Sequence, residues 1–247
     1  MMKYIKNPNL PETKVNTVIC GTEDEDILDF FKRNDISIIS IKPNNEIDIA
    51  VSTHADMAVS HLGNNVIIAD KNQKNLQEEL CSLNFKVHFA KNEISGKYPQ
   101  DIALNFAVVG NNIIGNFKYV DENLLNLISD KRKIDVKQGY CKCSILVIDE
   151  NAVITDDESI YRKTTENGID SLLVSKGDIL LSGHEYGFIG GASGKISKET
   201  VVFFGDIRKH KDYEKIVLFT KKHGCNFICT DDKELRDIGG IISIIEE

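Results

Sequence analysis

A pattern of apolar and polar positions recurs five times along the 247-residue chain. In each copy an amphipathic helical stretch precedes a short apolar strand, and a loop then leads to two apolar runs joined by a turn. The helical stretches are expected at residues 22–31, 72–83, 121–129, 157–166 and 212–223. The strands after them are expected at residues 36–41, 85–89, 134–136, 172–174 and 226–229. Thr22 and Glu25 have the spacing of a capping box that opens the first helix.

The paired apolar runs are most alike at residues 56–68 and 101–114, which both begin with an aspartate and turn at Gly-Asn-Asn. Further copies are expected at residues 142–154, 187–204 and 237–245. The last copy has no strand after its first apolar run. Residues 15–20 are apolar and are expected to supply it by pairing with residues 240–245, which would close the units into a ring.

Short strands separated by helices predict an α/β fold, in which each small sheet is covered by its helix. The five copies favour a pseudo-symmetric α/β propeller of five units, and the alternative is one open α/β sheet without symmetry. With 41% hydrophobic residues and no evident linker, residues 1–247 are predicted to form a single domain whose N-terminal strand closes the ring.

Charge and composition narrow the classes of partner. The net charge of -8 disfavours nucleic acid, which requires clustered basic residues, and the short basic runs at residues 131–133 and 208–211 are interpreted as solvated faces. No apolar run approaches the ~20 residues of a membrane span, and the first residues lack the apolar core of a signal peptide. The six cysteines are therefore expected to be reduced thiols in the cytoplasm.

Four segments carry a resemblance to a known fold superfamily: residues 98–105, 138–144, 186–194 and 237–240. They resemble an uncharacterised bacterial branch of the pentein, or guanidino-group-modifying-enzyme, fold, and the likeness covers roughly residues 15–247. This superfamily includes arginine deiminase, dimethylarginine dimethylaminohydrolase and arginine:glycine amidinotransferase, together with a non-catalytic ribosome anti-association factor. The resemblance implies five units around a central pocket for a guanidino compound.

The resemblance also implies a cysteine nucleophile, a histidine acid/base and carboxylates that grip the guanidinium nitrogens. The enzymes carry their cysteine in the last unit, whereas residues 237–245 contain neither cysteine nor histidine. The same three kinds of residue are present if the active site lies in other units of the ring than in the enzymes. Cys143 is then the nucleophile, His54 the acid/base and Asp237 the carboxylate. A nucleophilic Cys143 would need Lys142 or His54 to lower its pKa.

The substrate-binding residues are expected to surround this set. They are Asp56, Asp101, Asn105, Lys142, His184, Gly190, Gly191 and Ser193. Asp56, Asp101 and Asp237 are predicted to converge on one acidic pocket, and the alternative is that each caps a local turn.

Two further alternatives concern particular segments of the site. Lys142 can instead neutralise the aspartates, and strand alternation would then turn Cys141 and Cys143 away from the axis unless the strand begins after them. The glycines can present N–H groups to an anion or mark a close crossing of two backbones.

Two classes of function follow. One is a thiol-dependent hydrolase or amidinotransferase relative that acts on a small cationic compound, and the other is an inactive pentein that binds a ligand or a protein. A zinc site from the pairs Cys141, Cys143 and Cys225, Cys229 is disfavoured because both pairs lie in or beside predicted strands. No metal and no cofactor are expected.

Overall fold

The computed structural model describes residues 3–247. Its α-helices are α1 (Glu25–Arg33), α2 (Ala55–Ala58), α3 (Lys74–Ser82), α4 (Glu122–Leu127), α5 (Glu158–Glu166) and α6 (Tyr213–Lys222), and its 3-10 helices are η1 (Ile49–Val51) and η2 (Ile207–Lys209). The first strands are β1 (Lys3–Tyr4), β2 (Val15–Cys20), β3 (Ser37–Ser40), β4 (Val59–Gly63), β5 (Val66–Ala69), β6 (Lys86–Phe89), β7 (Ala107–Val109), β8 (Asn112–Gly115) and β9 (Arg132–Asp135). The remaining strands are β10 (Ile145–Asp149), β11 (Ala152–Thr155), β12 (Asp170–Leu173), β13 (Ile179–Leu180), β14 (Ser193–Ser197), β15 (Thr200–Phe203), β16 (Asn226–Cys229), β17 (Leu235–Arg236) and β18 (Ile242–Glu246).

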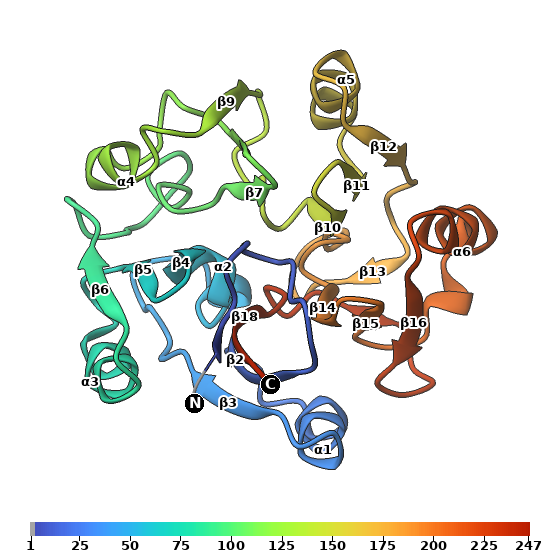
Figure 1. Ribbon diagram of the computed structural model, residues 1–247, viewed down its shortest axis with the longest axis horizontal. Coiled ribbons are helices and arrows are strands. Elements are labelled where there is room, and N and C mark those ends of the chain that lie inside the picture. Colours follow the sequence, from blue (N-terminus) through green and yellow to red (C-terminus); the bar gives the residue numbers. More distant parts are fainter. Residues whose placement is uncertain (1–2) are drawn as a thin grey trace.

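The same small sheet recurs along the chain, as the sequence pattern predicted. In the three-stranded sheets β4-β5-β6, β7-β8-β9, β10-β11-β12 and β14-β15-β16, an antiparallel hairpin is followed by a helix and a parallel strand. Figure 1 shows helices α1, α3, α4, α5 and α6 on the outside of the molecule, with the sheets inside them. The fold is therefore mixed α/β with several small sheets, which confirms the predicted class.

The two ends of the chain share one sheet. Strand β18 pairs antiparallel with β2, with Ile242 opposite Ile19, and β2 pairs in parallel with β3. The predicted pairing of residues 15–20 with the last apolar run is thus present. Figure 1 shows β2 and β18 together near the middle of the view.

The helices are placed by local signals close to those expected. Helix α1 begins two residues later than expected and is capped by the Asp24 side chain, which accepts from the N–H groups of Asp26 and Ile27. The predicted capping box of Thr22 and Glu25 is wrong, because the Thr22 hydroxyl accepts from the N–H of Asp24 instead.

The first strand of each hairpin begins later than predicted. Asp56 lies in the short helix α2, and Asp101 and Lys142 lie in turns before β7 and β10. Gly187 and Asp237 likewise lie in loops, before β14 and β18. The residues expected at the strand starts therefore occupy the irregular segments that precede the strands, where the side chains do not alternate between two faces.

Apolar faces between sheets and helices form the core. Around α3, for example, the buried side chains of Leu76 and Leu80 pack with Ile67, Ile39 and Phe85. Burial of a side chain of this kind contributes about 1.5–3 kcal/mol, so each helix is held on its sheet mainly by apolar contact. The framework fixes the ends of the strands, and with them the segments that carry the site.

Candidate functional site

A cavity of about 330 Å³ lies where several of these loops meet. It is lined by Asp48, Val51, His54, Tyr140, Cys143, Leu181, His184, Glu185, Tyr186, Phe188 and Asp237. The three residues predicted to be catalytic, Cys143, His54 and Asp237, are all among them. They come from the turn before β10, the N-cap of α2 and the loop after β17, so widely separated parts of the sequence meet here.

Cys143 lies in a helical turn and not in a strand. The N–H of Ser144 donates to the carbonyl of Tyr140 at 3.0 Å, and the N–H of Ile145 donates to the carbonyl of Lys142 at 3.3 Å. The strand begins after Cys141, Lys142 and Cys143, which is the exception left open by the sequence, so their side chains do not alternate between two faces. Cys143 lines the cavity, and Lys142 lies behind it, near the buried carboxylates of Asp56 and Asp237.

Asp237 is fixed by the backbone, and His54 lies beside it. The N–H groups of Phe188 and Gly239 donate to the two oxygens of Asp237 at 2.8 and 3.0 Å. His54 Nδ1 lies 3.8 Å from Asp237 Oδ1, and both side chains are almost fully buried. No hydrogen-bond partner for His54 Nδ1 is found among residues 3–247. A carboxylate with lone pairs to spare and an imidazole with a free ring nitrogen therefore face each other.

Behind the cavity, Asp56 and Lys142 form a buried charged group with Cys143. Burial raises the pKa of Asp56 to about 6, an effect that nearby His54 opposes. Burial, and then the carboxylates of Asp56 and Asp237, raise the pKa of the Cys143 thiol well above its usual value. Burial lowers the pKa of the Lys142 ammonium against the pull of these carboxylates. The thiol is therefore neutral in the ligand-free protein, in contrast to the lowered pKa that a nucleophilic Cys143 would need.

Asn105 connects two of the segments that form the site. Its Oδ1 accepts from the N–H of Lys142 at 2.7 Å, and its Nδ2 donates to the carbonyl of Asp56 at 3.0 Å and to Cys143 Sγ at 3.1 Å. Asn105 is buried and does not line the cavity. The structure thus places it as a clamp behind the site, and its predicted direct contact with a substrate is not supported.

Asp101 is not part of the same carboxylate group. Its Oδ2 accepts from the hydroxyl of Tyr140 at 2.6 Å, and Tyr140 in turn lines the cavity. Burial, followed by Asp101, raises the pKa of Tyr140, so that phenol remains protonated. Of Asp56, Asp101 and Asp237, Asp237 alone lines this cavity, while Asp56 lies behind it close to Cys143 and Asp237. That all three surround one pocket for a ligand stays a prediction.

The glycine segment is a close crossing of two backbones. A Cβ atom at Gly190 would lie 2.4–2.7 Å from the carbonyl oxygens of Lys142, Cys143 and Ile145, and one at Gly191 would lie 1.9 Å from Asp237 Oδ1. The N–H of Gly191 donates to the carbonyl of Cys143 at 2.9 Å.

The glycines thus let residues 190–191 pack against the turn that carries Cys143. The Ser193 hydroxyl donates to the carbonyl of Ile189 at 2.6 Å. Gly190, Gly191 and Ser193 do not line the cavity, so their contact with a ligand stays a prediction.

Of the residues at the mouth of the cavity, some were predicted from the sequence and others were not. His184 was predicted, and its Nε2 lies 3.5 Å from Asp48 Oδ2. Tyr140 and Phe188 stack with ring centroids 6.1 Å apart, and Tyr186 meets Phe188 edge-on at 6.2 Å. No spacing rule singles out Asp48, Tyr140 or Phe188, because they come from different loops that only the fold brings together.

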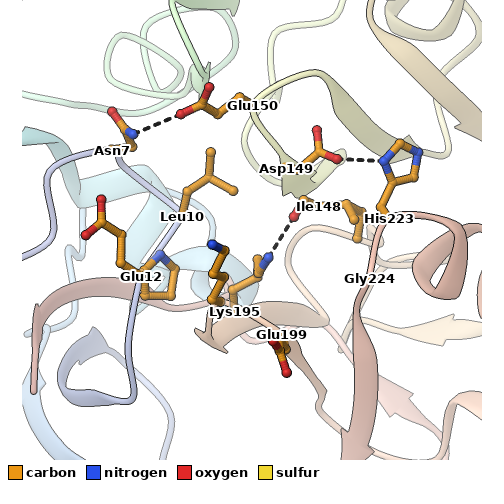
Figure 2. Close-up of a pocket in the computed structure, with 12 residues that line it drawn as sticks. Asn7, Leu10, Glu12, Ile148, Asp149, Glu150, Lys195, Glu199, His223 and Gly224 are labelled. Atoms are coloured by element: carbon orange, nitrogen blue, oxygen red, sulfur yellow. Dashed lines mark hydrogen bonds and ion pairs between the residues drawn. The ribbon is translucent and has the colours of Figure 1, made fainter.

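A larger cavity of about 460 Å³ lies elsewhere, at the hairpin ends of β10 and β14 (Figure 2). Its polar groups bind one another: Lys195 donates to the carbonyl of Ile148 at 2.7 Å, and the side chains of His223 and Asp149 are 2.6 Å apart (Figure 2). None of the predicted site residues lines it. The smaller cavity is therefore the candidate active site.

Residues 3–247 contain no cluster of three or more His, Cys, Asp or Glu side chains arranged to hold a metal ion. The two cysteine pairs considered for zinc have other neighbours. Cys141 donates to the carbonyl of Gln138, and Cys225 accepts from Lys195. Over the same residues, no helix is both long and apolar enough to cross a membrane.

Solved structures with the same fold are enzymes that modify guanidino compounds. An amidinotransferase of saxitoxin biosynthesis from Microseira wollei is 12% identical, with a TM-score of 0.61 over 92% of this chain and 91% of that one. Agmatine deiminase from C. jejuni is 13% identical, with a TM-score of 0.55 over 94% and 91% of the two chains. Dimethylarginine dimethylaminohydrolase (DDAH) from Pseudomonas aeruginosa, in complex with citrulline, is 12% identical, with a TM-score of 0.57 over 92% and 96%.

At these identities the likeness shows the fold alone, which is the pentein fold. The chain belongs to a family of unknown function, DUF6873, whose model matches residues 18–242. No curated protein matches the chain significantly.

Proposed function

We propose that this protein binds a small guanidino compound in the cavity formed by His54, Cys143 and Asp237, and that it acts on the guanidinium carbon through the Cys143 thiol. The convergence of these three side chains, from three distant segments, on one cavity carries the proposal. The pentein enzymes that share the fold act on compounds of the same class, which supports it.

Asp237 is suited to hold the cation. A carboxylate can accept about four hydrogen bonds, and the N–H groups of Phe188 and Gly239 use two of these positions. A guanidinium group offers planar N–H donors that match the remaining positions. The ligand would therefore place its flat cation between Asp237 and Cys143.

The guanidinium group of the ligand would also supply the positive charge that lowers the pKa of the Cys143 thiol. Burial, and then the carboxylates of Asp56 and Asp237, raise the pKa of Cys143 in the ligand-free protein. A positive group beside the sulfur would lower this pKa and favour the thiolate. His54 takes the proton of the Cys143 thiol, the thiolate attacks the guanidinium carbon, and His54 returns that proton to the departing amine as the carbon–nitrogen bond breaks. His54 then activates water, or an amine acceptor, which breaks the carbon–sulfur bond and restores the thiol.

The four three-stranded sheets, together with the sheet shared by the two ends of the chain, support a closed arrangement around this site. We propose that they form a pseudo-symmetric five-unit propeller within a single domain spanning residues 1–247, with β2 and β18 closing the ring. The six cysteines are free thiols, which fits a reducing compartment such as the cytoplasm.

A ligand panel with the full chain tests the proposed function. Arginine, agmatine and methylated arginines are compared with citrulline, a neutral isostere of arginine, by thermal shift. At least one guanidinium compound should raise the Tm while citrulline does not, because citrulline offers no cation to Asp237. Product formation is then followed by mass spectrometry for the compounds that bind.

Two cysteine variants separate catalysis from binding. Cys143→Ser should abolish turnover and retain binding, whereas Cys81→Ser, at an exposed thiol, should leave both unchanged. Equal Tm shifts for charged and neutral compounds, or none at all, overturn the guanidino proposal. Binding without turnover would identify the protein as an inactive pentein that serves as a binding module.

A further inference from the structure

The charges that line the candidate active site are arranged by depth. Asp237 lies at the buried end, with its side chain 1% exposed, whereas the Asp48 side chain is 56% exposed at the other end. Glu185 is also exposed and lines the same cavity. The cavity therefore has an acidic group at its base and two acidic groups at its mouth.

The wall between these two ends is apolar and aromatic. Val51 and Leu181 line it together with the rings of Tyr140, Tyr186 and Phe188. Such a wall holds an alkyl chain by apolar contact, and ring faces also tolerate a neighbouring cation. The middle of the cavity thus suits a short hydrocarbon linker.

No lysine or arginine is among the lining residues of this cavity in the described part of the chain. His184 Nε2 already lies 3.5 Å from Asp48, and the Lys176 ammonium lies over the Tyr186 ring, 5.4 Å from its centroid. At the mouth a ligand carboxylate would therefore meet the carboxylates of Asp48 and Glu185. Like charges at such distances repel, and a carboxylate loses hydration without compensation when it is buried. An amine at the mouth would instead be attracted by both carboxylates.

We infer that the substrate is a guanidino compound with a second cationic group, an amine, and without a carboxylate. This inference rests on the proposed function, because it assigns the guanidinium end to Asp237 and Cys143. The amine end lies at Asp48 and Glu185, and an alkyl linker of a few carbons crosses the apolar wall. Decarboxylated guanidino-amines fit this description, and free α-amino acids do not.

Calorimetric titration of the full chain at low ionic strength tests the inference with three compounds. Agmatine carries both cations, butylguanidine has the guanidinium and an alkyl chain without the amine, and arginine adds a carboxylate beside its amine. We expect agmatine to bind about fivefold more tightly than butylguanidine, since two partly exposed ion pairs each contribute modestly. We expect arginine to bind at least about tenfold more weakly than agmatine.

A double variant locates the amine. Asp48→Asn with Glu185→Gln should weaken agmatine about fivefold and change butylguanidine less than twofold, so that the two compounds bind alike. Asp232→Asn with Glu214→Gln makes the same charge change at exposed positions outside the cavity and should change neither affinity.

The outcomes separate the two proposals. If arginine binds as tightly as agmatine, or if the double variant weakens both guanidines equally, the inferred substrate class is wrong while the guanidino site stands. If none of the three compounds binds, the proposed function fails, and the inferred substrate class fails with it.

Discussion

Replacing Asn105 with alanine should destabilise the protein by about 4 kcal/mol. The N–H of Lys142 and the carbonyl of Asp56 each lose a buried hydrogen-bond partner, at 2.7 and 3.0 Å respectively. A buried polar group left without a partner costs about 1–3 kcal/mol, and two such groups give the stated sum. The weaker contact of Asn105 Nδ2 with Cys143 Sγ at 3.1 Å is lost as well.

The assay is urea unfolding followed by circular dichroism, with wild type and variant compared at equal m-value. Asn116→Ala is the matched control, because the Asn116 side chain makes one exposed hydrogen bond, to the carbonyl of Lys137 at 3.0 Å. It should cost about 0.5 kcal/mol. If Asn105→Ala and Asn116→Ala destabilise the protein equally, Asn105 does not clamp the site.

Three further predictions follow from the burial and geometry of the site. Without ligand, Cys143 should react with iodoacetamide far more slowly than exposed Cys81, and fast labelling of Cys143 near pH 6 would contradict its raised pKa. Because burial raises the pKa of Asp56 from 3.8 to about 6, the folded protein holds this proton more firmly, and the stability it contributes is lost as pH rises from about 4 to 6. The free energy of unfolding of Asp56→Asn, measured in urea, should therefore rise by about 3 kcal/mol relative to that of wild type between pH 4 and pH 7. If the difference between the two proteins is the same at both pH values, the reasoning is refuted. Gly239→Ala should abolish ligand binding in the thermal-shift panel, since its Cβ would lie 2.4 Å from that of the cavity histidine, whereas Gly168→Ala, also at positive φ but in open space, should bind normally.

The repeat along the sequence predicted the fold well, because helices and hairpins are encoded locally. The Gly-Asn-Asn turns show why: Gly63 and Asn64 both have positive φ, which these residue types adopt more readily than others. The missing last strand was also predictable, since an unpaired apolar strand at one end of the chain requires a partner, and residues 15–20 were suitable.

The site was predicted only in part, for a physical reason. A strand places its side chains by alternation, which would turn Cys141 and Cys143 away from Lys142 unless the strand begins after them. The strand begins at Ile145, so the three residues follow the geometry of a turn instead. The turn is set by the close crossing at Gly190, a contact between segments far apart in the sequence that no local pattern reveals.

The surroundings of Cys143 affect both the protonation state of its thiol and the charge of the ligand that the cavity favours. Burial, and then the carboxylates of Asp56 and Asp237, raise the pKa of the Cys143 thiol and keep it protonated when the cavity is empty, which protects it from adventitious alkylation or oxidation. On the proposed function, the same carboxylates would attract a cationic ligand, and its positive charge would oppose their effect on the sulfur. A neutral isostere would bring no such charge, so it would leave the thiol unreactive even if it fitted the cavity. On the proposed function, the charge of the substrate therefore selects the ligand and also switches on the nucleophile.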